Sequence, residues 1–194
     1  MSIVLLMTAA ALTGVPVAPI PVAADTACQV LLPNDVPVAG RKSPLDSLTF
    51  TVAEQSVKVC YGRPSSRGRT MLGGSAVPYG NLWRTGANEP TILFTPVALM
   101  VGGLRVPAGA YSIYSVPGAK EWEIIVNRSI KQWGEEHSYK PDIQAQEVGR
   151  TKVKSETLKE PVETFTIRSE TTGGATALVL EWERTRVRIP VKPA

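Results

Sequence analysis

The sequence predicts an all-β protein, built as a single antiparallel β-sandwich or a jelly-roll-like domain. Short runs that alternate between apolar and polar residues recur after Ser43, as expected for strands with one buried face. The chain holds 16 glycines and 16 prolines, and many of them fall between these runs, where they mark turns. No stretch shows an apolar helical period long enough for a packed helix. With 194 residues and 43% hydrophobic content, the chain is long enough for one such domain.

The first 24 residues indicate a signal peptide for export. They contain no charged side chain, are apolar from Ile3 to Leu12, and end in the small residues Val-Ala-Ala at 22–24, which signal peptidase reads. Cleavage there would begin a secreted, periplasmic or extracellular protein at Asp25. A retained membrane anchor is the alternative. A membrane span needs about 20 uninterrupted apolar residues, and three prolines interrupt this segment between residues 16 and 21.

Residues 25–42 are expected to form an extended, proline-rich arm, and residues 43–194 the β-sandwich domain. Cys28 falls in the arm and Cys60 in a predicted strand. In an oxidising compartment these two cysteines could pair. Alternatively, Cys60 is a small buried apolar residue and Cys28 belongs to an unattached tail. The sequence gives no prediction of the oligomeric state.

The domain is predicted to begin with a β-hairpin. Apolar or aromatic side chains occupy every second position on both sides of Glu54-Gln55, at Leu48, Phe50, Val52, Val57, Val59 and Tyr61. Pro64 then ends the second strand, because proline cannot donate a ladder hydrogen bond.

Further strands are predicted after Pro90, at 91–95, 98–101, 104–106, 111–116, 121–126, 148–153, 163–168, 177–182 and 185–191. In the last two, the apolar side chains move from even positions ending at Trp182 to odd positions starting at Val187. This change of parity requires a turn or bulge near Glu183-Arg184. Trp122 and Trp182 lie on the apolar faces of their strands and are predicted core residues.

The segment between Gly62 and Glu89 is predicted to be a long, ordered loop with a function. It is rich in glycine, and loops of this length without secondary structure are usually functional or disordered. Tyr79 and Trp83 favour order. Between Gln55 and Asn88 the chain has no Asp or Glu and carries five cations, at Lys58, Arg63, Arg67, Arg69 and Arg84. A local surplus of arginine predicts binding of an anion or a polar ligand, because guanidinium forks match carboxylates and phosphates.

The heptapeptide Trp-Arg-Thr-Gly-Ala-Asn-Glu at 83–89 is the predicted centre of this site. It combines an aromatic ring, a guanidinium, an amide and a carboxylate, as in a polar pocket that holds phosphate, carboxylate or sugar hydroxyls. The predicted ligand-binding residues are Arg63, Tyr79, Trp83, Arg84, Asn88 and Glu89. The alternative is a structural network that pins the loop, with Arg84 paired to an acid such as Glu89 or Glu147 and satisfied by loop carbonyls.

The chain resembles a bacterial family known as domain of unknown function 2911. The matching motifs are Ser43-Pro44, YGRP at 61–64, GR at 68–69, VPYG at 77–80, WRTGANE at 83–89, PAGAYS at 107–112, Trp122, Asn127, Trp133-Gly134 and EW at 181–182. The likeness spans about Arg41 to Val191, and the family's Tyr, Asp and Arg after the Trp-Gly pair correspond to Tyr139, Glu147 and Arg150. The resemblance implies an exported, β-rich protein of a family without an established activity.

Several functional classes find no support in the sequence. One histidine and two separated cysteines cannot assemble a zinc-type ligand set, so no metal site is predicted. The chain has no phosphate-binding glycine motif, and no cofactor is predicted. Nucleic-acid binding is not predicted either, because its basic residues would spread over a whole face. A membrane contact is expected only through the N-terminal segment.

The sequence is therefore compatible with three functions. The first is an exported binding or accessory module that recognises a small anionic or carbohydrate ligand. The second is a hydrolase or lyase in which Glu89 is the general acid or base and Arg84 stabilises developing charge. The third is a structural envelope protein without a ligand. The sequence favours the first and leaves open whether the protein is an enzyme.

Overall fold

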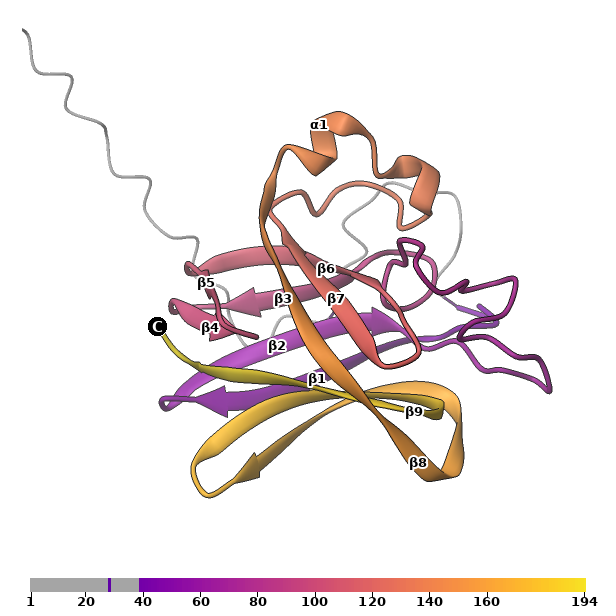
Figure 1. Ribbon diagram of the computed structural model, residues 1–194. Coiled ribbons are helices and arrows are strands. Elements are labelled where there is room, and N and C mark those ends of the chain that lie inside the picture. Colours follow the sequence, from indigo (N-terminus) through magenta and orange to yellow (C-terminus); the bar gives the residue numbers. More distant parts are fainter. Residues whose placement is uncertain (1–27, 29–38) are drawn as a thin grey trace, which may run out of the picture.

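The computed structural model describes Cys28 and residues 39–194, most of which lie in nine β-strands (Figure 1). The strands are β1 (Leu45–Val52), β2 (Gln55–Gly62), β3 (Thr91–Thr95), β4 (Leu99–Val101), β5 (Leu104–Val106), β6 (Gly109–Val116), β7 (Glu121–Asn127), β8 (Glu147–Thr172) and β9 (Ala175–Pro193). Two short helical turns, η1 (Glu136–Ser138) and α1 (Pro141–Gln144), lie between β7 and β8. The predicted signal peptide and most of the arm lie outside the described residues.

The strands form one antiparallel sheet in the order β1-β2-β3-β6-β7-β8-β9-β4-β5. This confirms the predicted all-β, antiparallel class. The 26-residue β8 pairs first with β7 and then with β9, so it joins the two parts of the sheet. It crosses the view in Figure 1 from α1 down to the β8–β9 hairpin. The strands predicted at 148–153 and 163–168 are therefore one strand, as are those at 177–182 and 185–191. No described residue belongs to a helix with the length and hydrophobicity of a membrane crossing.

The predicted hairpin of β1 and β2 is confirmed, with an uninterrupted register from Leu45 opposite Gly62 to Val52 opposite Gln55. Its two turn residues, Ala53 and Glu54, have φ angles of 48° and 63°. Two consecutive positive φ angles give the turn whose twist matches that of the strands it joins.

The predicted irregularity near Glu183 is also confirmed. Glu183 has a φ of 50°, and the β8–β9 register shifts at Val162, which lies opposite it. This bulge turns the apolar side chains of β9 back toward the core, where Trp182 and Val187 are both buried.

The apolar core contains side chains from both ends of the sheet order. Val59 of β2, Leu93 of β3, Ile124 of β7 and Phe165 of β8 are all buried in one cluster with Val191 of β9. Trp122 and Trp182 belong to it, as predicted. The sheet therefore curves around its own core.

A second buried layer lies on the outer face of β6 and β7. Tyr114 and Ile125 are opposite each other in the register and have no exposed surface, although neither belongs to the main core. The segment 128–146, with η1 and α1, extends above these two strands (Figure 1). Asn127 Nδ2 donates to the Ile143 carbonyl at 2.8 Å and fixes this segment on the sheet.

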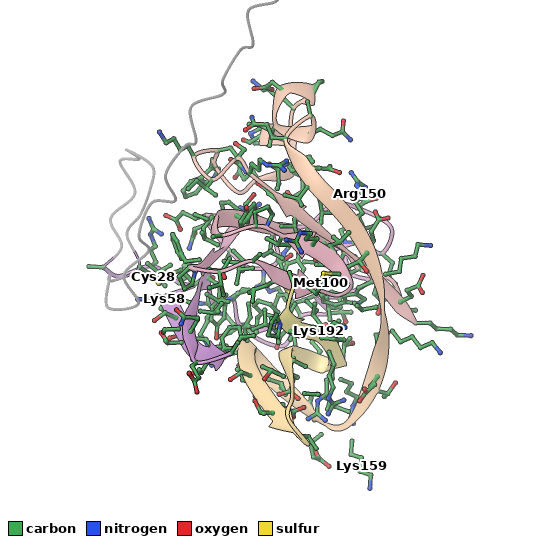
Figure 2. The ribbon with its side chains drawn as sticks, turned by 90° about the vertical axis from the view of Figure 1, so that its left-hand side faces the viewer. Cys28, Lys58, Met100, Arg150, Lys159 and Lys192 are labelled. Carbon is green, nitrogen blue, oxygen red and sulfur yellow. A yellow bond between two sulfur atoms is a disulfide. The ribbon has the colours of Figure 1, made fainter. Side chains whose placement is uncertain are left out.

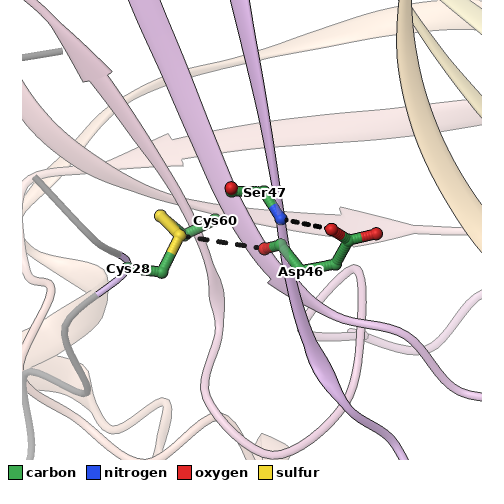
Figure 3. Close-up of a disulfide and its surroundings, with 4 residues drawn as sticks. All are labelled: Cys28, Asp46, Ser47 and Cys60. Carbon is green, nitrogen blue, oxygen red and sulfur yellow. Dashed lines mark hydrogen bonds between the residues drawn. A yellow bond between two sulfur atoms is a disulfide. The ribbon is translucent and has the colours of Figure 1, made fainter. Parts of the chain in front are cut away.

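A disulfide joins Cys28 to Cys60, and it settles the alternative that the sequence left open (Figure 3). The bond connects the arm to β2 across 32 residues. Closing a loop of this length in the unfolded chain contributes about 3–4 kcal/mol to stability in the chain-entropy model.

Candidate functional site

The loop between β2 and β3 is fixed along its length by β8 and β9. Phe165 N–H donates to the Pro64 carbonyl at 2.8 Å, and Ser66 N–H donates to the Glu163 carbonyl at 3.0 Å. Further along, the Glu183 carboxylate accepts hydrogen bonds from the backbone N–H groups of Met71 at 2.9 Å and Leu72 at 2.7 Å. These contacts order the loop without a ligand.

Arg63, a predicted ligand-binding residue, connects β8 to β1. Its Nε donates to the Phe165 carbonyl at 3.3 Å and its Nη2 to Thr166 Oγ1 at 3.1 Å. Its Nη1 pairs with Asp46 Oδ2 at 3.2 Å. All three guanidinium nitrogens thus have protein partners, although the side chain is 33% exposed.

Arg67 and Arg69 lie at the exposed tip of the loop. Arg67 Nη2 donates to the Lys42 carbonyl, while Arg69 donates to the carbonyls of Ser66 at 3.0 Å and Ser65 at 3.3 Å. Backbone carbonyls therefore satisfy part of each guanidinium, and both side chains keep contact with water.

Trp83 belongs to the core. Its ring is 4% exposed, stacks on Trp182 at 5.7 Å between ring centroids, and meets Trp122 and Phe165 edge to face. Its Nε1 donates to the Gly86 carbonyl at 3.1 Å. The ring is out of reach of a ligand, so its role is to hold the 83–89 heptapeptide on the core.

Glu89 forms a buried ion pair with Arg41. Both of its carboxylate oxygens accept from Arg41 Nη1 at 2.8 Å, and the two side chains are 4% (Arg41) and 11% (Glu89) exposed. Arg41 carried no functional prediction from sequence, because nothing local links it to a residue 48 positions away. This geometry gives Glu89 a partner within the protein instead of access to a substrate.

Asn88 contributes to the same inner layer. It has a φ of 66°, and its Nδ2 donates to the Ser43 carbonyl at 3.1 Å. Its own carbonyl accepts from Arg84 Nη1 at 3.3 Å. The amide therefore connects the heptapeptide to the start of the domain.

Two close backbone approaches explain why glycines occur in these motifs. A Cβ atom on Gly62 would lie 2.0 Å from the Ala87 carbonyl oxygen. A Cβ on Gly134 would lie 2.3 Å from the Asn88 carbonyl oxygen and 2.9 Å from Arg84 Cδ. Only glycine fits at both positions.

Arg84 is the cation of the heptapeptide, and its guanidinium reaches η1. Its Nη2 pairs with Glu136 Oε2 on η1 at 3.3 Å, and its side chain is 18% exposed. The Glu136 side chain is 44% exposed. The structure thus brings Arg84 together with Asn88, Gly134 and Glu136, of which sequence reasoning had singled out only Asn88 as a ligand-binding residue.

Tyr79 lies apart from this group in the loop, and its ring is 45% exposed. A Cβ on Gly73 would come within 2.6 Å of that ring, so the tyrosine packs closely against Gly73. The neighbouring Gly80 N–H donates to the Pro117 carbonyl at 2.8 Å, which places the residue near the β6–β7 turn.

A polar network surrounds Tyr139, Glu147 and Arg150, the family residues that follow the Trp-Gly pair. Tyr139 Oη donates to Glu147 Oε1 at 2.7 Å and accepts from Asn127 Nδ2 at 3.0 Å. Arg150 donates to both Glu147 oxygens at 2.8 Å and to Glu123 Oε2 at 2.9 Å. Figure 2 shows Arg150, a residue of β8, on the side of the molecule away from Cys28.

Hydrogen bonds and burial shift the pKa values of Glu147 and Tyr139 in this network. Hydrogen bonds from Arg150, and then from Tyr139, lower the pKa of Glu147 despite partial burial. Burial is the main cause of the raised pKa of Tyr139. The network therefore stays ionised at neutral pH with its charges paired, which suits a clamp that holds segment 128–146 on β6 and β7.

A surface hollow of about 460 Å³ lies beside the bulge of β8, lined by Glu156, Lys159, Glu181, Arg186 and neighbouring residues. Glu181 accepts from Arg168 Nη2 at 3.0 Å and from Arg186 Nε. The Glu181 carboxylate in the hollow is thus already paired within the protein. Among the described residues, no group of three or more acids, histidines and cysteines is placed to hold a metal ion.

The comparisons with known proteins bear on the family. The model of the family described as protein of unknown function (DUF2911) matches residues 43–191, which is most of the chain. Neither the curated proteins nor the solved structures contain a match. The chain belongs to the DUF2911 family.

Proposed function

We propose that the protein is an exported binding or accessory module that recognises a small anionic or carbohydrate ligand through Arg84. The observation that carries this proposal is the incomplete pairing of that guanidinium. Among the residues that the structure describes, it contacts the Asn88 carbonyl and Glu136, and both contacts are 3.3 Å long. Long contacts to a backbone carbonyl and to a surface carboxylate are weak, and a ligand can replace them.

Arg150 provides the contrast within the same molecule. It makes three hydrogen bonds of 2.8–2.9 Å to the carboxylates of Glu147 and Glu123. A guanidinium bound in this bidentate manner is already neutralised and has little affinity left for a ligand. Arg84 has the same charge, but its guanidinium lacks such short hydrogen bonds to carboxylates.

The disulfide supports the exported location. Disulfides such as Cys28–Cys60 persist in oxidising compartments and are rare in the reducing cytosol. The uncharged first 24 residues, which predict a signal peptide, point to the same location.

A structural envelope protein is the second candidate function, and the buried Arg41–Glu89 pair favours it. In that pair, and in the contacts of Arg63 with Phe165 and Asp46, charged side chains hold parts of the protein to one another. The hydrolase or lyase alternative receives the least support, because both oxygens of Glu89 are already engaged by Arg41.

A ligand screen tests the proposal. Thermal-shift assays with sugars, inorganic phosphate and small carboxylates, followed by calorimetric titration of any hit, should find a compound that stabilises the protein. Arg84→Gln should abolish that stabilisation, whereas Arg67→Gln, with the same loss of charge at the loop tip, should retain it. If nothing in the screen stabilises the wild-type protein, the structural role is favoured.

A further inference from the structure

Building on the proposed role of Arg84, we propose that its site takes a carboxylate-bearing ligand, and that the Glu136 side chain is the internal carboxylate which this ligand displaces. The ion pair between Arg84 Nη2 and Glu136 Oε2, at 3.3 Å, joins side chains 52 positions apart in the sequence. This ion pair shows that the Arg84 guanidinium already binds a carboxylate group.

Glu136 can leave without disturbing the fold. It is the first residue of η1, a three-residue turn in which no residue is buried. The turn is held through its backbone, where Tyr139 N–H donates to the Glu136 carbonyl at 3.0 Å, and through the Tyr139 side chain on Asn127 and Glu147. The Glu136 side chain can therefore rotate into water while η1 stays in place.

Arg84 itself is held in position to receive the ligand. Gly134 packs so closely on its stem that a Cβ there would lie 2.9 Å from Arg84 Cδ. Among the described residues, two N–H groups of its guanidinium are engaged, and an arginine carries about five. A fixed stem with free donors loses little entropy when it binds a planar group with two oxygens.

The surroundings favour a carboxylate over a phosphate. The Asn88 carbonyl oxygen already contacts Nη1, so a third or fourth ligand oxygen on that side would meet another acceptor. Glu135, which pairs with His137 at 3.3 Å, adds a second negative charge next to Glu136. Repulsion from this charge weakens binding of a dianionic phosphate more than that of a monoanionic carboxylate.

The test uses the Nε–Hε signal of Arg84 in ¹⁵N NMR spectra of the full-length, oxidised protein, assigned by its absence in Arg84→Gln. Acetate and glucuronate are titrated as carboxylate probes, and inorganic phosphate as the comparison. Both carboxylates should shift the signal at lower concentration than phosphate does. Glu136→Gln should tighten carboxylate binding by about two- to fivefold, the range expected when an exposed ion pair no longer competes.

Glu135→Gln is the matched control, because it removes the same charge one position away and leaves the Arg84 contact intact. Equal tightening in both variants would show a general charge effect and overturn the displacement of Glu136 by the ligand, while the proposed binding function would stand. Phosphate binding as tight as carboxylate binding would overturn the ligand class. If no probe shifts the signal even in Glu136→Gln, both this inference and binding of small anions at Arg84 are contradicted.

Discussion

The Tyr61 hydroxyl hydrogen-bonds both backbone groups of Ile167 on β8, as the backbone of a neighbouring strand would. It accepts a hydrogen bond from the Ile167 N–H at 3.0 Å and lies 3.4 Å from the Ile167 carbonyl oxygen, to which it donates. Its burial raises the pKa of this tyrosine, so it remains a neutral donor and acceptor. Together with Arg63, Tyr61 connects the first strands to β8, where no ladder joins them.

Tyr61→Phe should therefore destabilise the protein although it removes a single oxygen atom. The backbone N–H and carbonyl of Ile167 would lose their partner in a buried place, at a cost of about 1–3 kcal/mol. Urea denaturation measures this change. Tyr79→Phe, on an exposed ring, is the control and should stay within about 0.5 kcal/mol. Equal stability of wild type and Tyr61→Phe would show that water satisfies Ile167.

Reduction of the Cys28–Cys60 disulfide should lower the free energy of unfolding by about 3 kcal/mol, because the 32-residue separation is no longer closed in the unfolded chain. Denaturation with and without dithiothreitol measures the difference. Cys28→Ser should have the lower stability in both conditions and no response to reductant. An unchanged midpoint in reduced wild-type protein would contradict a stabilising role.

Glu89→Gln should be among the most destabilising single substitutions in the heptapeptide. It removes the buried negative charge that Glu89 places against the Arg41 guanidinium, whose side chain is 4% exposed. Breaking such a pair typically costs about 3–5 kcal/mol. Glu136→Gln removes the partner of Arg84 at the surface and should cost less than about 1 kcal/mol. Similar losses in the two variants would mean that the Arg41–Glu89 pair is not a buried anchor.

Acid should weaken the clamp at Glu147. Because Arg150 lowers the pKa of Glu147 in the folded protein, this carboxylate contributes stability above its ordinary pKa in the unfolded chain. That contribution is lost as the pH falls through the lowered pKa. Glu147→Gln should thus show a smaller decrease of unfolding free energy between neutral and acidic pH than wild type. A parallel pH dependence of the two proteins would exclude this linkage.

The sequence predicted what local patterns determine. The β1–β2 hairpin follows from its alternation, the irregularity at Glu183 from a change of parity, and the burial of Trp182 from its place on a strand face. The continuity of β8 was missed because Pro161 and the charged residues before it resemble a break between two strands.

The site was predicted less completely, because long-range contacts decide what each side chain does. Trp83 is aromatic whether it meets a ligand or the core, and its burial depends on Trp182, far along the chain. Whether the Glu89 carboxylate is available to a ligand depends on its ion pair with Arg41, which lies 48 positions away in the sequence. Composition indicated the Arg-bearing segment, but only the fold shows which of its arginines are anchored by several contacts and that Arg84 is held by two long ones.

The most direct test of the account compares Arg84→Gln with Arg63→Gln by thermal unfolding, each with and without the best stabilising ligand from the screen. Arg84→Gln should keep the Tm of the free protein within about 2–4 °C of wild type, because its contacts are worth about 1 kcal/mol or less, and should lose the rise in Tm on ligand addition. Arg63→Gln should lower the Tm of the free protein and retain the rise. Ligand binding through Arg84 is contradicted if Arg84→Gln unfolds at a much lower temperature and still responds to the ligand.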